Sequence, residues 1–202
     1  MFGLELETPL LAQAPATVVI VIDDTQVRPG DGPRVAELID RLEQHVLDSR
    51  ATFGIATVGP AGLNVDLTRD RRRLREASDA ARAGRLDFTL PPNAAMAAAA
   101  LVATMESVVS GVAALPGPKA VVVIGRAADV AEKRRPQWVS LRGKADVARI
   151  ALAWVDLGGS SCRAGTSATD ASLATGPAMC APVSDASAIS ELLHAVARGS
   201  AR

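Results

Sequence analysis

The chain has 202 residues, of which 49% are apolar, and its 22 basic and 22 acidic side chains balance at pH 7. This length suits one domain with a substantial core. The balanced charge excludes the basic footprint of a nucleic-acid-binding domain, and no uninterrupted apolar run reaches the ~18–20 residues of a membrane span.

Residues 1–15 are predicted to be a poorly ordered leader or the start of a truncated chain, and residues 16–200 a single domain. The leader carries Glu5 and Glu7 but no basic residue. This is the wrong charge for a secretory signal peptide, so no signal peptide is expected.

The first predicted strand, Thr17–Ile22, is β-branched at every position. Such a run is typical of a strand buried on both faces of a parallel sheet. It ends in Asp23, Asp24 and Thr25. Open α/β sheets bind their ligands at the carboxyl ends of the strands, so these three residues are the first candidates for a binding site.

The next segments are predicted to form an amphipathic helix, a hairpin and a second helix. The short connection between the two strands favours an antiparallel pair. Asp31 or Gly32 is expected to cap the first helix, and Thr68 the second. The predicted ranges are Pro33–Asp48, Ala51–Val58, Leu63–Leu67 and Arg69–Ala83.

The following helix, Ala94–Leu115 with Asn93 as its cap, consists almost entirely of small apolar residues. We expect it to be buried on most sides against the sheet. Lys119–Ile124 is predicted to be a second fully buried strand, followed by Gly125 and Arg126. The remaining expected elements are a partly helical segment Val130–Val147, a strand Ala148–Val155, a loop Ser160–Pro182 and a helix Ser184–Arg198.

Two cysteines, Cys162 and Cys180, lie in the predicted polar loop. They form either a disulfide, which would imply an oxidising, extracytoplasmic compartment, or two unrelated thiols. Two cysteines without paired histidines are a poor zinc site.

Strands that alternate with helices predict a three-layer α/β/α, doubly wound, Rossmann-like fold. The sheet is expected to be mainly parallel, with the second strand of the hairpin as one antiparallel edge strand. The first strand is expected at the centre of this sheet.

Several segments share the order and spacing of a known family. They are the Val-Ile-Val-Ile-Asp-Asp strand end, the hairpin with its Thr68-Arg-Asp-Arg-Arg-Arg-Leu helix start, the alanine-rich helix, and the strands Val121–Ile124 and Ile150–Asp156. Over Thr17 to Val196 the chain resembles a von Willebrand factor type A domain of the bacterial VWFA-related kind. The resemblance implies a protein-binding module with a divalent metal above the sheet.

The metal ligands that the resemblance implies are only partly present. The family pattern is Asp-x-Ser-x-Ser after the first strand, a threonine before the central helix and an aspartate after the fourth strand. Asp23 and Thr25 fit the first two positions. The other three positions carry Val27, Pro92–Asn93 and Gly125–Arg126. Because magnesium sheds its waters reluctantly, we expect at most weak magnesium binding at Asp23 and Thr25 and no tightly bound cofactor.

Arg126 suggests a replacement for the missing cation. We hypothesise that its guanidinium stands near Asp23 or Asp24, with a side chain directed to solvent as the alternative.

Other classes of site fit the sequence less well. A receiver-like or other magnesium-dependent phosphoryl-handling domain could use Asp23 and Asp24 and is kept as the alternative function. A dinucleotide-binding Gly-x-Gly-x-x-Gly does not follow the first strand, and no P-loop occurs. His45 and His194 are expected on helix surfaces, and no Gly-x-Ser-x-Gly elbow is present for a hydrolytic triad.

The sequence therefore favours a non-enzymatic protein-interaction module that binds another protein through loops at the carboxyl ends of the strands. Its degenerate metal-ion-dependent adhesion site is expected to contribute Asp23, Asp24, Thr25, Asn93 and Arg126 to binding. The sequence leaves the oligomeric state and the identity of the partner open.

Overall fold

The computed structural model describes residues 16–28, 30–45, 50–86, 94–126, 135–158, 179–182 and 191. In this part of the chain a six-stranded sheet has the order β3-β2-β1-β4-β5-β6. β1 (Thr17–Ile22) lies at the centre, parallel to β2 (Thr52–Thr57) and β4 (Lys119–Gly125). The predicted central position of the first strand is confirmed.

The outer strands complete a mainly parallel sheet. β5 (Ile150–Asp156) and β6 (Met179–Pro182) continue it in parallel on one side. On the other side β3 (Val65–Thr68) pairs antiparallel with β2 and forms that edge of the sheet. The predicted hairpin and its antiparallel edge strand are therefore confirmed.

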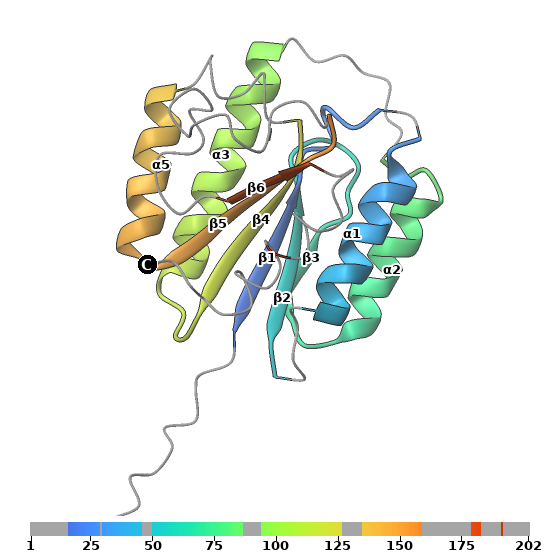
Figure 1. Ribbon diagram of the computed structural model, residues 1–202, viewed down its shortest axis with the longest axis horizontal. Coiled ribbons are helices and arrows are strands. Elements are labelled where there is room, and N and C mark those ends of the chain that lie inside the picture. Colours follow the sequence, from blue (N-terminus) through green and yellow to red (C-terminus); the bar gives the residue numbers. More distant parts are fainter. Residues whose placement is uncertain are drawn as a thin grey trace, which may run out of the picture.

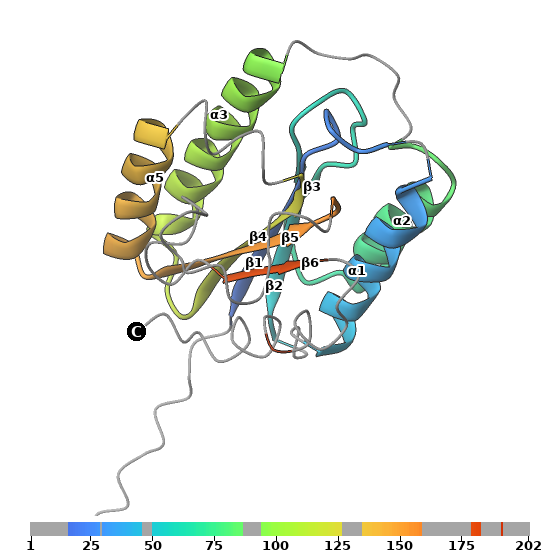
Figure 2. The ribbon, with the colours of Figure 1, turned by 45° about the horizontal axis from the view of Figure 1, so that its top comes forward.

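Helices cover both faces of the sheet (Figure 1). α1 (Gly32–His45) and α2 (Arg71–Arg82) pack on one face, and α3 (Ala94–Ala113) and α5 (Arg135–Val147) pack on the other. The turned view in Figure 2 shows the same two pairs on either side of the strands. The expected three-layer, Rossmann-like α/β fold is present.

The side chains of β1 alternate between the two cores. Val18, Ile20 and Ile22 join the core under α1 and α2, whereas Val19 and Val21 join the core under α3 and α5. Successive residues of a strand point to opposite faces, so a strand with helices on both sides must be apolar throughout. This is why the uninterrupted β-branched run became the central strand.

Specific contacts fix the helices in place. Ser78 of α2 donates to the Ala36 carbonyl at 3.2 Å and to Asp40 Oδ1 at 2.6 Å, both on α1. On the opposite face Trp138 of α5 meets Trp154 of β5 edge to face, with ring centroids 5.7 Å apart. Edge-to-face pairs of this kind add to the stability gained from burial alone.

The cap of α2 differs from the expected one. Asp70, not Thr68, holds the N-cap position, and its side chain accepts a hydrogen bond from the Arg72 amide at 3.0 Å. Thr68 is the last residue of β3, and its hydroxyl accepts from the Asp70 amide at 3.1 Å. The strand ends one residue later than predicted, at Thr68, so the helix starts later.

α3 is more exposed than predicted. Only 39% of its most apolar window is buried, and Met96 is 69% exposed. Alanine is apolar but is also the strongest helix former, so an alanine-rich helix does not have to be buried on most sides. By length and composition alone, Ala95–Ala113 would suffice to cross a membrane, as some core helices also would. The absence of a membrane span stays a prediction.

β6 lies inside the segment that was expected to be a loop, Ser160–Pro182. A four-residue strand at the edge of a sheet carries too little periodicity to be read from sequence. The leader at residues 1–15 and most of the predicted helix Ser184–Arg198 lie outside the described residues, although Glu191 is helical. The division into a leader and a single domain stays a prediction.

Candidate functional site

The carboxyl ends of four neighbouring strands, β2, β1, β4 and β5, bring polar residues together. Ile22 of β1 is in register with Ile124 of β4, and Gly125 of β4 with Asp156 of β5. We call this region the carboxyl edge; it comprises residues 23–28, 30 and 31 after β1, 59–64 after β2, 125 and 126, and 156–158. Four of its aspartates are buried, namely Asp23, Asp24, Asp31 and Asp156.

Asp23 is fully buried and bonded within its own loop. Its Oδ1 accepts from the Thr25 hydroxyl at 2.5 Å, and its Oδ2 accepts from the Gln26 amide group at 2.8 Å. Burial raises the pKa of Asp23 from 3.8 to about 6, against the opposing effect of the two hydrogen bonds. Asp23 is therefore only partly ionised at slightly acidic pH.

Asp24 faces a different part of the molecule. Its two oxygens accept from the backbone amides of Gly59 at 2.5 Å and Ala61 at 2.8 Å. This carboxylate joins the loop after β1 to the turn between β2 and β3. A side chain on Gly59 would place its Cβ 3.0 Å from Asp24 Oδ2, so the close approach of the turn favours glycine there. Asp24 thus has a structural role at the edge.

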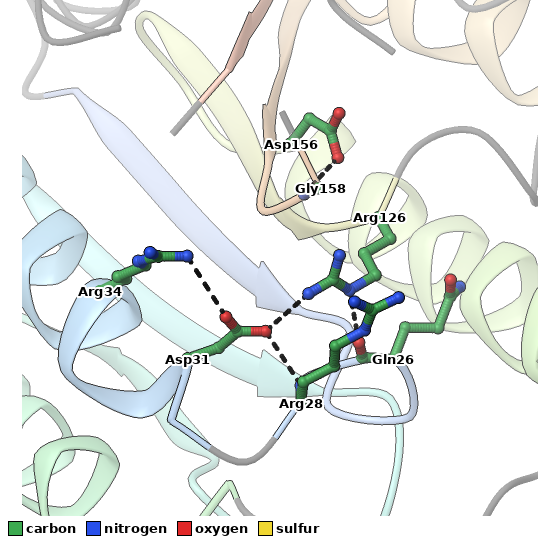
Figure 3. Close-up of polar contacts among 7 residues, drawn as sticks. All are labelled: Gln26, Arg28, Asp31, Arg34, Arg126, Asp156 and Gly158. Carbon is green, nitrogen blue, oxygen red and sulfur yellow. Dashed lines mark hydrogen bonds and ion pairs between the residues drawn. The ribbon is translucent and has the colours of Figure 1, made fainter. Parts of the chain in front are cut away.

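Arg126 pairs with neither of the two carboxylates expected. Within the described residues its Nη2 donates to Asp31 Oδ2 at 2.9 Å and its Nε to the Gln26 carbonyl at 3.1 Å (Figure 3). Among the described residues Arg126 makes no hydrogen bond or ion pair with Asp23 or Asp24, and the hypothesis that it stands near them in place of a cation stays a prediction. Arg126 is also not directed freely into solvent, because its side chain is only 19% exposed. Arg126 connects the end of β4 to the loop between β1 and α1.

The described residues do not fit the family's magnesium site. Both oxygens of Asp23 already accept protein hydrogen bonds, and the buried Val27 offers no side-chain oxygen. At the position of the missing aspartate, a Cβ on Gly125 would lie 2.9 Å from the Asp23 Cβ, so no side chain fits without a shift. In the part of the chain that is described, no group of three or more His, Cys, Asp or Glu residues could hold a metal ion.

Several predicted site residues lie outside this description. Asn93 and Cys162 belong to segments that the structure does not describe. Cys180 lies in β6, but only its backbone is described, so the disulfide stays a prediction. His45 ends α1 with an undescribed side chain, and His194 lies outside the described residues.

Sequence reasoning missed two partners at the edge. Asp31 was considered only as a cap for α1, and its carbonyl does accept from the amides of Arg34 and Val35. Its side chain instead accepts from the Arg28 amide at 3.0 Å and from Arg126. Gln26 was not singled out, yet it contacts both Asp23 and Arg126. Only the position of both residues in the loop after β1 could have pointed to them.

Comparison with known proteins adds no family assignment. No protein-family model matches the chain, and no curated protein matches it either.

Proposed function

We propose that this chain is a non-enzymatic protein-interaction module with a von Willebrand A-like fold, which binds its partner at the carboxyl edge without a tightly bound metal. A central first strand, an antiparallel edge hairpin and a helix that starts just after Thr68 agree with the resemblance and support it. The fold alone does not imply a function, so the argument rests on the edge itself.

One observation carries the proposal: three of the buried edge carboxylates are used to hold loops together. Asp23 bonds Thr25 and Gln26, Asp24 bonds two backbone amides, and Asp31 bonds Arg126. Groups that are committed in this way position the loops of a binding surface. Catalysis would instead require a nucleophile or base within reach of a substrate.

The alternative, a magnesium-dependent phosphoryl-handling domain, requires Asp23 and Asp24 to act on one ion. Their bonding partners differ, since Asp23 lies against Gly125 of β4 and Asp24 against the turn after β2. This separation argues against a shared metal and favours the interaction module.

Site-specific photocross-linking tests the proposal. A photoreactive residue is placed at Pro60, which is exposed at the carboxyl edge. The matched control places it at Val147, which is 87% exposed at the end of α5, just before β5 begins at the opposite end of the sheet. The chain is irradiated in cells of its native organism, and the adducts are separated and identified.

We expect a discrete protein adduct from position 60 that is absent from position 147. The same adducts at both positions, or none at position 60, would overturn the proposed function.

A further inference from the structure

Among the charged side chains at the carboxyl edge and the start of α1, the aspartates are buried and two arginines are exposed. Asp23, Asp24, Asp31 and Asp156 are buried, whereas Arg28 and Arg34 are exposed. Arg126 is less exposed, with 19% of its side chain accessible to solvent. We call Arg28, Arg34 and Arg126 the arginine cluster; Figure 3 shows the three around Asp31.

One carboxylate serves all three residues of the cluster. Asp31 Oδ2 accepts from Arg126 Nη2 and from the Arg28 backbone amide, and Oδ1 lies 3.7 Å from Arg34 Nη1. The guanidinium groups of Arg126 and Arg34 and the backbone amide of Arg28 therefore share this one carboxylate. The acid one turn along α1 does not balance them, because Glu37 pairs with Arg41 at 2.6 Å.

Much of the donor capacity of the cluster is unused. The Arg28 guanidinium makes no hydrogen bond or ion pair within the described residues, and Arg126 leaves its Nη1 unpaired there. Arg34 is 60% exposed, and its contact with Asp31 is long. Guanidinium groups bind carboxylates through two parallel hydrogen bonds, and a guanidinium that is already held in place loses less entropy on binding.

We propose that the carboxyl edge binds an acidic segment of its partner protein, rich in aspartate or glutamate, through the arginine cluster. This rests on the proposed function and names the class of partner. Charge complementarity favours an acidic partner, and an acidic peptide is favoured over nucleic acid. The chain as a whole carries no net charge, and the aromatic side chains described, Phe53, Trp138 and Trp154, are buried away from any stacking role.

Peptide binding tests the chemistry directly. The probe is a fluorescein-labelled peptide of alternating glutamate and glycine, titrated with the full chain at low salt and followed by anisotropy. The test variant is Arg28→Gln with Arg34→Gln, both exposed, which removes two charges without adding an acid. The matched control is Arg73→Gln with Arg75→Gln, two exposed arginines on α2. Thermal melting checks that both variants are folded.

We expect the edge variant to weaken peptide binding about fivefold or more, and the α2 variant to change it less than about twofold. Binding should also weaken with added salt. Equal losses in the two variants, or no binding by the native chain, would overturn the proposal. Single-stranded DNA that binds as tightly as the peptide with the same dependence on the edge arginines would also overturn it, since the site would then accept any polyanion.

The cross-link at position 60 separates the two proposals. Loss of the protein adduct in the edge variant, but not in the α2 variant, supports an acidic partner. An adduct retained at full yield in the edge variant overturns the acidic partner and leaves the interaction module standing. Absence of any adduct in the native chain overturns the interaction module itself.

Discussion

Asp23 and Asp24 are neighbours in the chain but meet different surroundings. Asp24 accepts hydrogen bonds from two backbone amides of the turn after β2. Asp23 accepts hydrogen bonds from two side chains of its own loop. Strand residues project alternately to opposite sides, and the strand ends one residue before Asp23. Adjacent acids can therefore take separate roles at the same strand end.

The raised pKa of Asp23 predicts a pH dependence of stability. Its pKa is about 6 in the folded chain and 3.8 when unperturbed, so the folded state binds more protons between these values. The contribution of Asp23 to stability is therefore greatest below the unperturbed pKa and falls as pH rises through the folded pKa. The difference between the two pKa values corresponds to an upper limit of ~3 kcal/mol in the free energy of unfolding.

Asp23→Asn removes this titration while keeping the shape and an acceptor for Gln26. We expect the native chain to gain stability relative to the variant as the pH falls from about 6 to about 4. Urea unfolding of both proteins across this range measures the difference. A difference that does not change with pH would contradict the assigned burial of Asp23.

At the scale of the elements, caps and composition decide where helices begin and how they pack. α2 begins after Asp70 because that side chain satisfies an amide of the first turn, which is otherwise left without a partner. In α3 the composition predicts the helix but not its burial, since its many alanines favour helix formation without requiring burial.

Asp70→Ala is expected to destabilise the protein by about 1 kcal/mol, because the Arg72 amide loses its acceptor. Asp70→Asn retains a capping oxygen and should lower the free energy of unfolding by much less. Chemical denaturation of both variants beside the native chain checks this order. Equal losses would mean that Asp70 contributes through its charge rather than through its cap.

For the whole molecule, the doubly wound sheet gathers the strand ends at one edge, where the loops meet. At this edge a Cβ on Gly125, where the resemblance places a metal-binding aspartate, would lie 2.9 Å from the Asp23 Cβ, and Arg126 bonds Asp31. Hydrogen bonds and an ion pair between protein groups hold the loops of this edge together.

We expect millimolar Mg²⁺ or Mn²⁺ to leave the melting temperature unchanged, because Asp23 and Thr25 already bond each other. An ion present at one hundred times its Kd would add about 2.7 kcal/mol of stability. Scanning fluorimetry with added metal or chelator measures this, with Asp23→Asn as the control. A saturable rise that disappears in the control would point to the phosphoryl-handling alternative.

The elements that have local signals can be predicted from the amino-acid sequence. The unbroken β-branched run of β1, the apolar run of β4 and the apolar stripe of α1 are local signals that each predict an element and the faces it buries. The short hairpin connection predicted the antiparallel edge, because such a connection can join only strands that run in opposite directions.

The hydrogen bonds of the carboxyl edge, in contrast, depend on how the whole chain folds. Arg126 reaches Asp31 and Gln26 across 95 and 100 residues of sequence, and Asp24 reaches Gly59 across 35. The acid that pairs with a long arginine side chain depends on the positions of the loops in the folded chain. No local sequence pattern predicts these positions. β6 likewise exists because β5 offers it a ladder of hydrogen bonds, since its four residues carry no periodic signal of their own.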